Sequence, residues 1–152
     1  MRFLSALLFL PIWLVACSVD LSASDVSLTA RIHDESIQVT NGAFGGLEGS
    51  FLLELALGSE APAPTRVSLG KFELHNADGG FLADLGDATV EPMFPVDLNK
   101  GESKEVLFTL DGIGVDRDSV CQGLVRIVGS VTDSLKGGTV SVQGALVTPD
   151  CP

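Results

Sequence analysis

The sequence contains no tyrosine, and its single tryptophan, Trp13, lies in the first apolar stretch. Sugar-binding clefts usually use these two aromatic residues, whose rings stack on sugar faces. The chain also has only two histidines, His33 and His75, and no Gly-x-Ser-x-Gly motif of the kind that carries a nucleophilic serine. These absences disfavour carbohydrate binding and nucleophilic catalysis, and we predict a protein that is not an enzyme.

Basic residues are also scarce. The 152-residue chain has 9 lysines and arginines against 20 aspartates and glutamates, which gives a formal net charge of −11. Such a surface repels the phosphates of nucleic acids and the anionic head groups of lipids. We therefore predict no nucleic-acid partner, and no membrane attachment through a basic patch.

Only one long apolar run is present, at the start of the chain. Arg2 is followed by apolar residues from Phe3 to Ala16, interrupted only by Ser5 and Pro11. One positive charge followed by about a dozen apolar residues is typical of a secretory signal peptide. A permanent transmembrane helix needs about 20 such residues. We predict that residues 1–16 are a signal peptide.

The apolar run ends in Leu14-Val15-Ala16-Cys17. This tetrapeptide resembles the lipobox of bacterial lipoproteins. The resemblance implies that the Cys17 thiol receives a diacylglyceryl group, that a peptidase cuts between Ala16 and Cys17, and that the new amino group takes a further acyl chain such as palmitate. An ordinary signal peptide is the alternative, but it would place Leu14 where a small residue is preferred. By resemblance to proteobacterial lipoproteins, Ser18 implies transport to the outer membrane.

The expected location is therefore the cell membrane or the outer membrane, with the protein facing the periplasm or the cell exterior. Each buried CH₂ group contributes about 0.8 kcal/mol, so two or three acyl chains hold a protein firmly. Residues 17–25 are predicted to be the lipidated cysteine and a short polar tether with a span of about 16 Å. Cleavage would remove one arginine and no acidic residue, which would bring the formal charge to about −12.

Two cysteines remain, Cys121 and Cys151. An even number of cysteines in an exported chain indicates a disulfide. Two free thiols or a pair of metal ligands are the alternatives. Two cysteines this far apart, in a chain with only two histidines, are a poor set of zinc ligands. Cys121 shares a parity with Val125 and Ile127, so we expect the disulfide to tie the end of the chain to a strand.

Residues 26–152 show an apolar period of two, which predicts strands. Val67 and Leu69 have one parity and Phe72 and Leu74 the other, so a bulge is expected at 70–71. The clearest alternating sets are Val26, Leu28, Ala30 and Ile32; Phe51, Leu53, Leu55 and Leu57; and Val106, Phe108 and Leu110. Ile37 and Val39 suggest a short separate strand, and Val140 and Val142 begin the last one. Lys136-Gly137-Gly138 supplies the turn before it.

Seven to nine short strands between glycine, proline, asparagine and aspartate turns predict an all-β fold. We expect a single antiparallel β-sandwich, with an eight-stranded β-barrel as the alternative. The segment from Leu98 to Thr109, in which a Gly-Glu-Ser turn leads into alternating valine and phenylalanine, resembles a passage of bacterial immunoglobulin-like and fibronectin-III-like domains. The resemblance implies an immunoglobulin-like sandwich and no particular ligand.

Acidic loops are the remaining candidates for a site. Calcium takes 6–8 oxygen ligands, commonly from loop carboxylates. The candidate ligands are Asp78, Asp84 and Asp87, with Asn76 nearby, in one region and Asp111, Asp116 and Asp118 in a second. Neither set has EF-hand spacing, so solvated turns are the simpler interpretation. We expect no cofactor, and we interpret both histidines as exposed turn residues.

The leading hypothesis is a lipid-anchored, non-catalytic envelope protein. It would be a protein-interaction or structural module with an envelope protein as its partner. The alternative is an envelope module that binds a small ligand or calcium.

Overall fold

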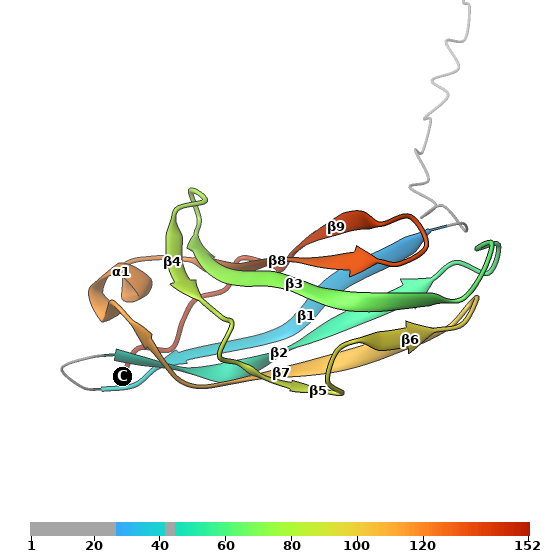
Figure 1. Cartoon of the computed structure of the whole chain (residues 1–152). Helices are drawn as coiled ribbons and strands as arrows, with labels where there is room; N and C mark the ends of the chain where they lie inside the picture. The colour runs from blue at the N-terminus through green and yellow to red at the C-terminus, as the bar shows by residue number, and fades with distance from the viewer. Residues whose placement is uncertain (1–26, 42–44) are drawn as a thin grey trace, which may run out of the picture.

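The structure is a computed structural model, and it describes residues 27–41 and 45–152. The predicted signal peptide, Cys17 and the tether lie outside these residues, and so does Val26, the first residue of the predicted first strand. In the described part, β-strands form two sheets that face each other, with one short helix at one end (Figure 1).

The elements follow one another along the chain as strands with a single helical turn. They are β1 (Leu28–Val39), β2 (Gly45–Leu57), β3 (Thr65–Asn76), β4 (Phe81–Asp84), β5 (Thr89–Glu91), β6 (Val96–Leu98), β7 (Ser103–Val115), α1 (Arg117–Cys121), β8 (Val125–Asp133) and β9 (Gly138–Gln143).

One sheet has the strand order β1-β2-β7-β5, and the other has β4-β3-β8-β9 with β6 paired to β3. The ladders between these strands are antiparallel. Lettered along the chain, the first sheet has the A-B-E-D order of immunoglobulin sandwiches, and the second has C-F-G with an added edge strand. The predicted all-β sandwich is confirmed, and the two open sheets rule out the barrel alternative.

The alternating pattern places the core as expected. Phe51, Leu53 and Leu55 of β2 are fully buried, as are Val106 and its same-face neighbours on β7. The predicted bulge is also present, because the β3–β8 register shifts between Leu69 and Phe72. A Cβ on Gly70 would lie 2.5 Å from the carbonyl oxygen of Ser130. Only glycine lets the two backbones approach this closely.

Three phenylalanine rings join the two sheets at the centre of the core. Phe51 and Phe108 stack within the first sheet with ring centroids 4.4 Å apart. Phe72 from the second sheet lies 4.9 Å from Phe108 and 5.9 Å from Phe51. Gly129 makes room for this ring, since a Cβ there would lie 2.4 Å from it. These three rings form the aromatic centre of the core between the two sheets.

Strand β1 differs from its predicted form. Ile37 and Val39 do not make a separate strand but continue the strand that begins at Leu28. The register with β2 shifts between His33 and Ser36, and Asp34 has a φ of +55°. This bulge changes the parity, and the change explains why the sequence pattern looked like two pieces.

Cys121 lies on α1 and not on a strand, so this part of the disulfide prediction was wrong. The pairing itself is confirmed: Cys121 and Cys151 form a disulfide with their Cα atoms 6.1 Å apart. The residues after β9 run beside both sheets, since Val147 pairs with Val125 of β8 and Asp150 pairs with Gln38 of β1. The C-terminal segment (residues 144–152) therefore bridges the two sheets at the α1 end.

We predict that replacing both Cys121 and Cys151 by alanine lowers the free energy of unfolding by about 3–4 kcal/mol. The reason is that the oxidised pair closes a loop of 30 residues and so restricts the unfolded chain. Urea unfolding monitored by circular dichroism measures the change, and the wild type in reducing agent should match the double variant. A loss below about 1 kcal/mol in both samples would contradict the prediction.

Candidate functional site

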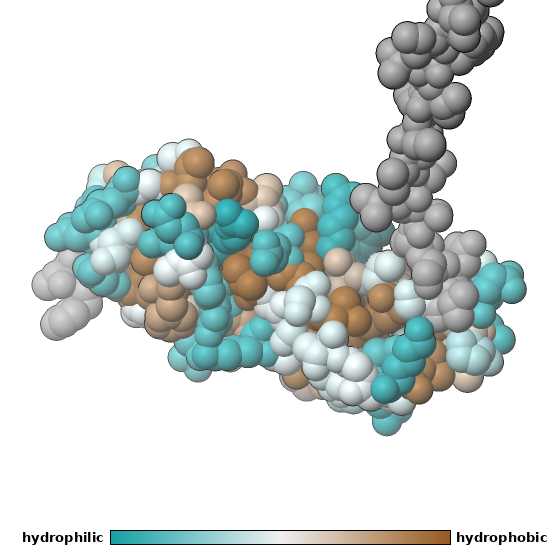
Figure 2. All heavy atoms as spheres, turned by 90° about the horizontal axis from the view of Figure 1, so that it is seen from above, coloured by the Kyte–Doolittle hydropathy of each residue, from teal (hydrophilic) through white to brown (hydrophobic). Residues whose placement is uncertain are grey.

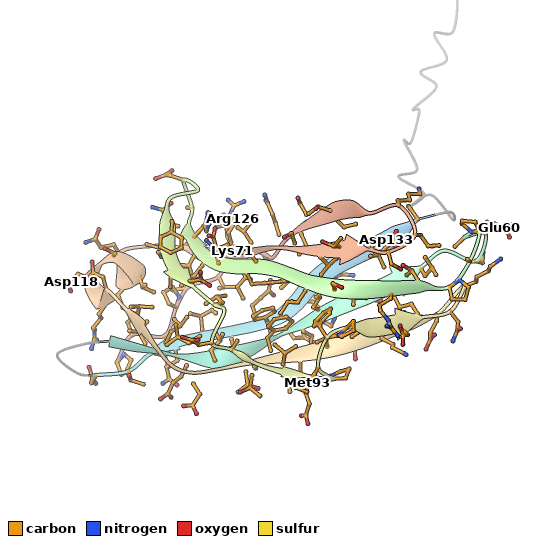
Figure 3. The ribbon with its side chains drawn as sticks, in the orientation of Figure 1. Glu60, Lys71, Met93, Asp118, Arg126 and Asp133 are labelled. Atoms are coloured by element: carbon orange, nitrogen blue, oxygen red, sulfur yellow. A yellow bond between two sulfur atoms is a disulfide. The ribbon has the colours of Figure 1, made fainter. Side chains whose placement is uncertain are left out.

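The candidate site lies nearer to one end of the sandwich than to the other. Leu28, the start of β1, lies at the end where Glu60 is labelled, and α1 with Asp118 lies at the opposite end (Figures 1 and 3). The labelled Arg126 lies on the β4-β3-β8-β9 sheet, towards the α1 end (Figure 3). The residues around Arg126 form the candidate site.

The site is a hollow of about 390 Å³ on the outer face of this sheet. The strand register explains how its walls come together: His75 of β3 lies opposite Arg126 of β8, and Val128 of β8 lies opposite Gln143 of β9. Alternation points Ile127 into the core, so these neighbours face outwards. The remaining wall is the β3–β4 hairpin at 77–79. The hollow therefore joins three strands and a turn.

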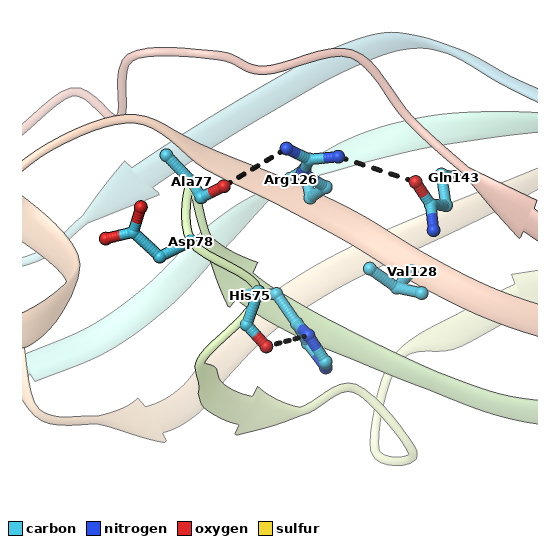
Figure 4. Close-up of a pocket in the computed structure, with 7 residues that line it drawn as sticks. His75, Ala77, Asp78, Arg126, Val128 and Gln143 are labelled. Atoms are coloured by element: carbon cyan, nitrogen blue, oxygen red, sulfur yellow. Dashed lines mark hydrogen bonds between the residues drawn. The ribbon is translucent and has the colours of Figure 1, made fainter.

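Arg126 is held by neutral partners. One terminal nitrogen donates to the carbonyl oxygen of Ala77 at 3.2 Å, and the other donates to Oε1 of Gln143 at 3.4 Å (Figure 4). Its Nε atom is buried and has no hydrogen-bond partner among the described residues. Asp78 lines the hollow as well, but its carboxylate points away from Arg126 (Figure 4). Arg126 is thus a half-buried cation with no carboxylate of the described chain paired to it.

A series of hydrogen-bonded polar side chains lies beside Arg126 on β3. The Nε2 atom of His75 lies 2.8 Å from Oε2 of Glu73, and its Nδ1 atom lies 3.0 Å from the carbonyl oxygen of Gly79. Lys71 donates to the second carboxylate oxygen of Glu73. Glu73 therefore already contacts both Lys71 and His75.

These contacts change two ionisation equilibria. The hydrogen bond from Lys71, and then that from His75, lower the pKa of Glu73 below its ordinary value. The same bond to Glu73 raises the pKa of Lys71. Lys71 also lies 3.8 Å from Asp84 and 5.8 Å from the centroid of the Phe81 ring. The contacts of Lys71 thus lie at the β3–β4 edge of the face.

Exposed apolar side chains occur on the chain segments next to the hollow. Phe81 is 58% exposed and packs edge-on against His75. Leu124 and Leu146 are each more than 40% exposed. A second, smaller hollow of about 240 Å³ lies on the other side of the hairpin, between Asp78 and Leu124. Figure 2 looks onto this sheet and shows hydrophobic residues in several places among polar ones. The face therefore combines charge with apolar contact area.

The other histidine lies away from this face. His33 is in the middle of β1, beside its bulge, and so was wrongly predicted to be an exposed turn residue. Its side chain is 23% exposed, with Nδ1 at 3.1 Å from Asp34 and Nε2 at 3.4 Å from Glu105. The same prediction was wrong for His75, which lies in β3 and has a side chain that is only 19% exposed. Among the described residues, the partners of both rings are carboxylates and one backbone carbonyl.

The candidate calcium ligands are not brought together as one group in the described residues. In residues 27–41 and 45–152, no three His, Cys, Asp or Glu side chains form a group that could hold a metal ion. Asp84 and Asp87 line one open hollow of about 440 Å³, whereas Asp78 lies on the hairpin. Asp116 precedes α1 and accepts a hydrogen bond from Ser119. The remaining candidates, Asp111 and Asp118, are exposed as well.

Sequence reasoning missed Arg126 and Gln143. The outward parity of residues 126 and 128, opposite the predicted core positions 125 and 127, was a signal for the first. No local pattern indicates which strands lie beside β8, so the sequence could not bring the two residues together.

Comparison with known proteins gave no match to a protein family, to a curated protein or to a solved structure. In the part of the chain described here, no helix has the length and hydrophobicity needed to cross a membrane.

We predict that Lys71→Met raises the pKa of Glu73 towards the ordinary glutamate value of about 4.3. In the wild type the lowered pKa stabilises the fold above that value, and the contribution is lost as the pH falls through the lowered pKa. Carbon-detected NMR titration of the Glu73 carboxyl group measures the shift. Lys104→Met, which removes the partner of Glu102, is the matched control and should leave Glu73 unchanged. An unchanged Glu73 titration in Lys71→Met would contradict the assignment.

Proposed function

We propose that this chain is a lipid-anchored, non-catalytic module of the bacterial cell envelope that binds another molecule through the outer face of the β4-β3-β8-β9 sheet. The lipid anchor is proposed from the Leu14-Val15-Ala16-Cys17 sequence. The observation that carries the binding role is the hollow around Arg126, which is lined by a cation that has no carboxylate partner among the described residues. Enrichment in arginine and aromatic residues is typical of binding surfaces.

The geometry supports display away from a membrane. Strands β2 and β7 each have 13 residues. At about 3.3 Å per residue such a strand is roughly 40 Å long. The described chain begins at one end of these strands (Figure 1), and Arg126, which lines the hollow, lies towards the other end (Figure 3). An anchor on residue 17 would therefore leave the binding face well clear of the bilayer surface.

The same proposal includes a structural role in the envelope, because a rigid face can support either binding or assembly. The side chains of the face are fixed by the strand ladders and by the Phe51, Phe72 and Phe108 contacts beneath them. A face held on strands binds without the ordering cost that a loop would incur. This rigidity supports binding and gives no reason to invoke a reaction.

We predict that Cys17→Ser abolishes both incorporation of labelled palmitate and fractionation with membranes. The reason is that the proposed thioether to the lipid needs the sulfur of Cys17. The matched control is the double variant Cys121→Ser and Cys151→Ser, which loses the same atom type elsewhere and should keep the label. Labelling of Cys17→Ser, or an unlabelled wild type, would contradict the anchor.

A photo-crosslinking amino acid at Leu124 tests the binding face. Leu124 is 42% exposed and borders the hairpin, and Glu60 is exposed at the opposite end of the sandwich. We expect a discrete adduct of constant mass from position 124 in intact envelopes and none from position 60. Equal adducts from both positions, or none from position 124, would argue against this face.

A further inference from the structure

We propose that the hollow around Arg126 is a carboxylate-binding site, in which the guanidinium of Arg126 and the side-chain amide of Gln143 donate to a carboxylate carried by a peptide or by a small free acid. This inference rests on the proposed function, because it assigns a ligand chemistry to the same face. A failed carboxylate titration would leave the membrane and cross-linking results standing.

The first argument is the unpaired charge. The chain has 20 acidic residues, yet the guanidinium of Arg126 contacts only a backbone carbonyl and an amide oxygen among the described residues. The other basic side chains nearby already have an acidic partner, since Lys71 and His75 both contact Glu73. A half-buried charge that has given up part of its hydration gains most from a charged partner.

The second argument is the number of donors. A guanidinium carries five N–H groups, and Ala77 and Gln143 each accept from one of them. The Nε–H group is buried beneath the others. Two N–H groups on the terminal nitrogens therefore remain, and two donors on a planar fork match the two oxygens of a carboxylate. Gln143 adds its NH₂ group, because its Oε1 atom faces the guanidinium.

The third argument is the surroundings of this fork. The nearest carboxylate in the wall, that of Asp78, is turned away from it (Figure 4). Val128 forms an apolar floor, and the exposed side chain of Leu146 follows shortly after Gln143 in the chain. The volume of the hollow, about 390 Å³, lies at the small end of the range for small-molecule sites. A carboxylate with a short apolar chain fits these walls.

The test is an NMR titration of the full-length chain in detergent micelles, which follows the Nε–H signal of Arg126. Burial protects this proton from exchange with water and keeps the signal visible. The probes are acetate, N-acetyl-trialanine with a free carboxylate, and the same peptide as its amide. We expect saturable shifts with the free-carboxylate peptide and none with the amide. Saturation by acetate at the same affinity would assign the site to small acids, and a tighter peptide would assign it to peptide termini.

Variants make the result specific. Arg126→Gln should weaken carboxylate binding about tenfold or more, read from the amide signals of Gly79 and Val128. Arg31→Gln, which removes an exposed arginine from the opposite sheet, changes net charge equally and should bind as the wild type does. Gln143→Glu keeps Arg126 but supplies an internal carboxylate, so it should block binding while the fold is retained. Equal shifts with peptide acid and amide, or binding that survives Gln143→Glu, would overturn the proposal.

Discussion

The contact among Phe51, Phe72 and Phe108 is the constraint on which the rest of this structure depends. It is where the two sheets meet, and Gly129 allows it by leaving space for the ring of Phe72. Aromatic pairs contribute about 0.5–1.5 kcal/mol beyond the area that they bury. Because Phe72 and Gly129 lie on β3 and β8, the same contact fixes the two strands whose outward residues form the hollow.

Most of the fold could be predicted from the sequence. Alternation identified the buried faces of β2 and β7, and the parity change at Gly70 identified a real bulge. The bulge in β1 was misread as a gap because Asp34 gave no glycine signal. Cys121 was misplaced because one helical turn is too short to show a period.

The site was less predictable than the fold, for a physical reason. The sequence pattern shows which residues face outwards, but it does not show which strands are neighbours. His75, Arg126 and Gln143 lie far apart in the chain and meet only through the order β3-β8-β9. Conversely, the acidic residues that drew attention to calcium are spread over strands and turns, and no three of them form one group in the described residues. Proximity in the sequence was thus a poor guide to proximity in space.

The proposed protein combines an anchor, a rigid spacer and a binding face. The acidic surface disfavours anionic partners in general, so a single cationic hollow gives a local exception with chemical selectivity. The C-terminal segment adds a covalent tie at the end of the sandwich nearest to this face. These features fit a module that must keep one surface intact outside the cytoplasm.

The mass of the intact protein purified from membranes tests this account most directly. The account predicts one species that begins at Cys17, carries the mass of two or three acyl chains, and lacks the two hydrogens lost in joining Cys121 to Cys151. A species that begins at Met1, without acyl groups and with three free thiols, would contradict it.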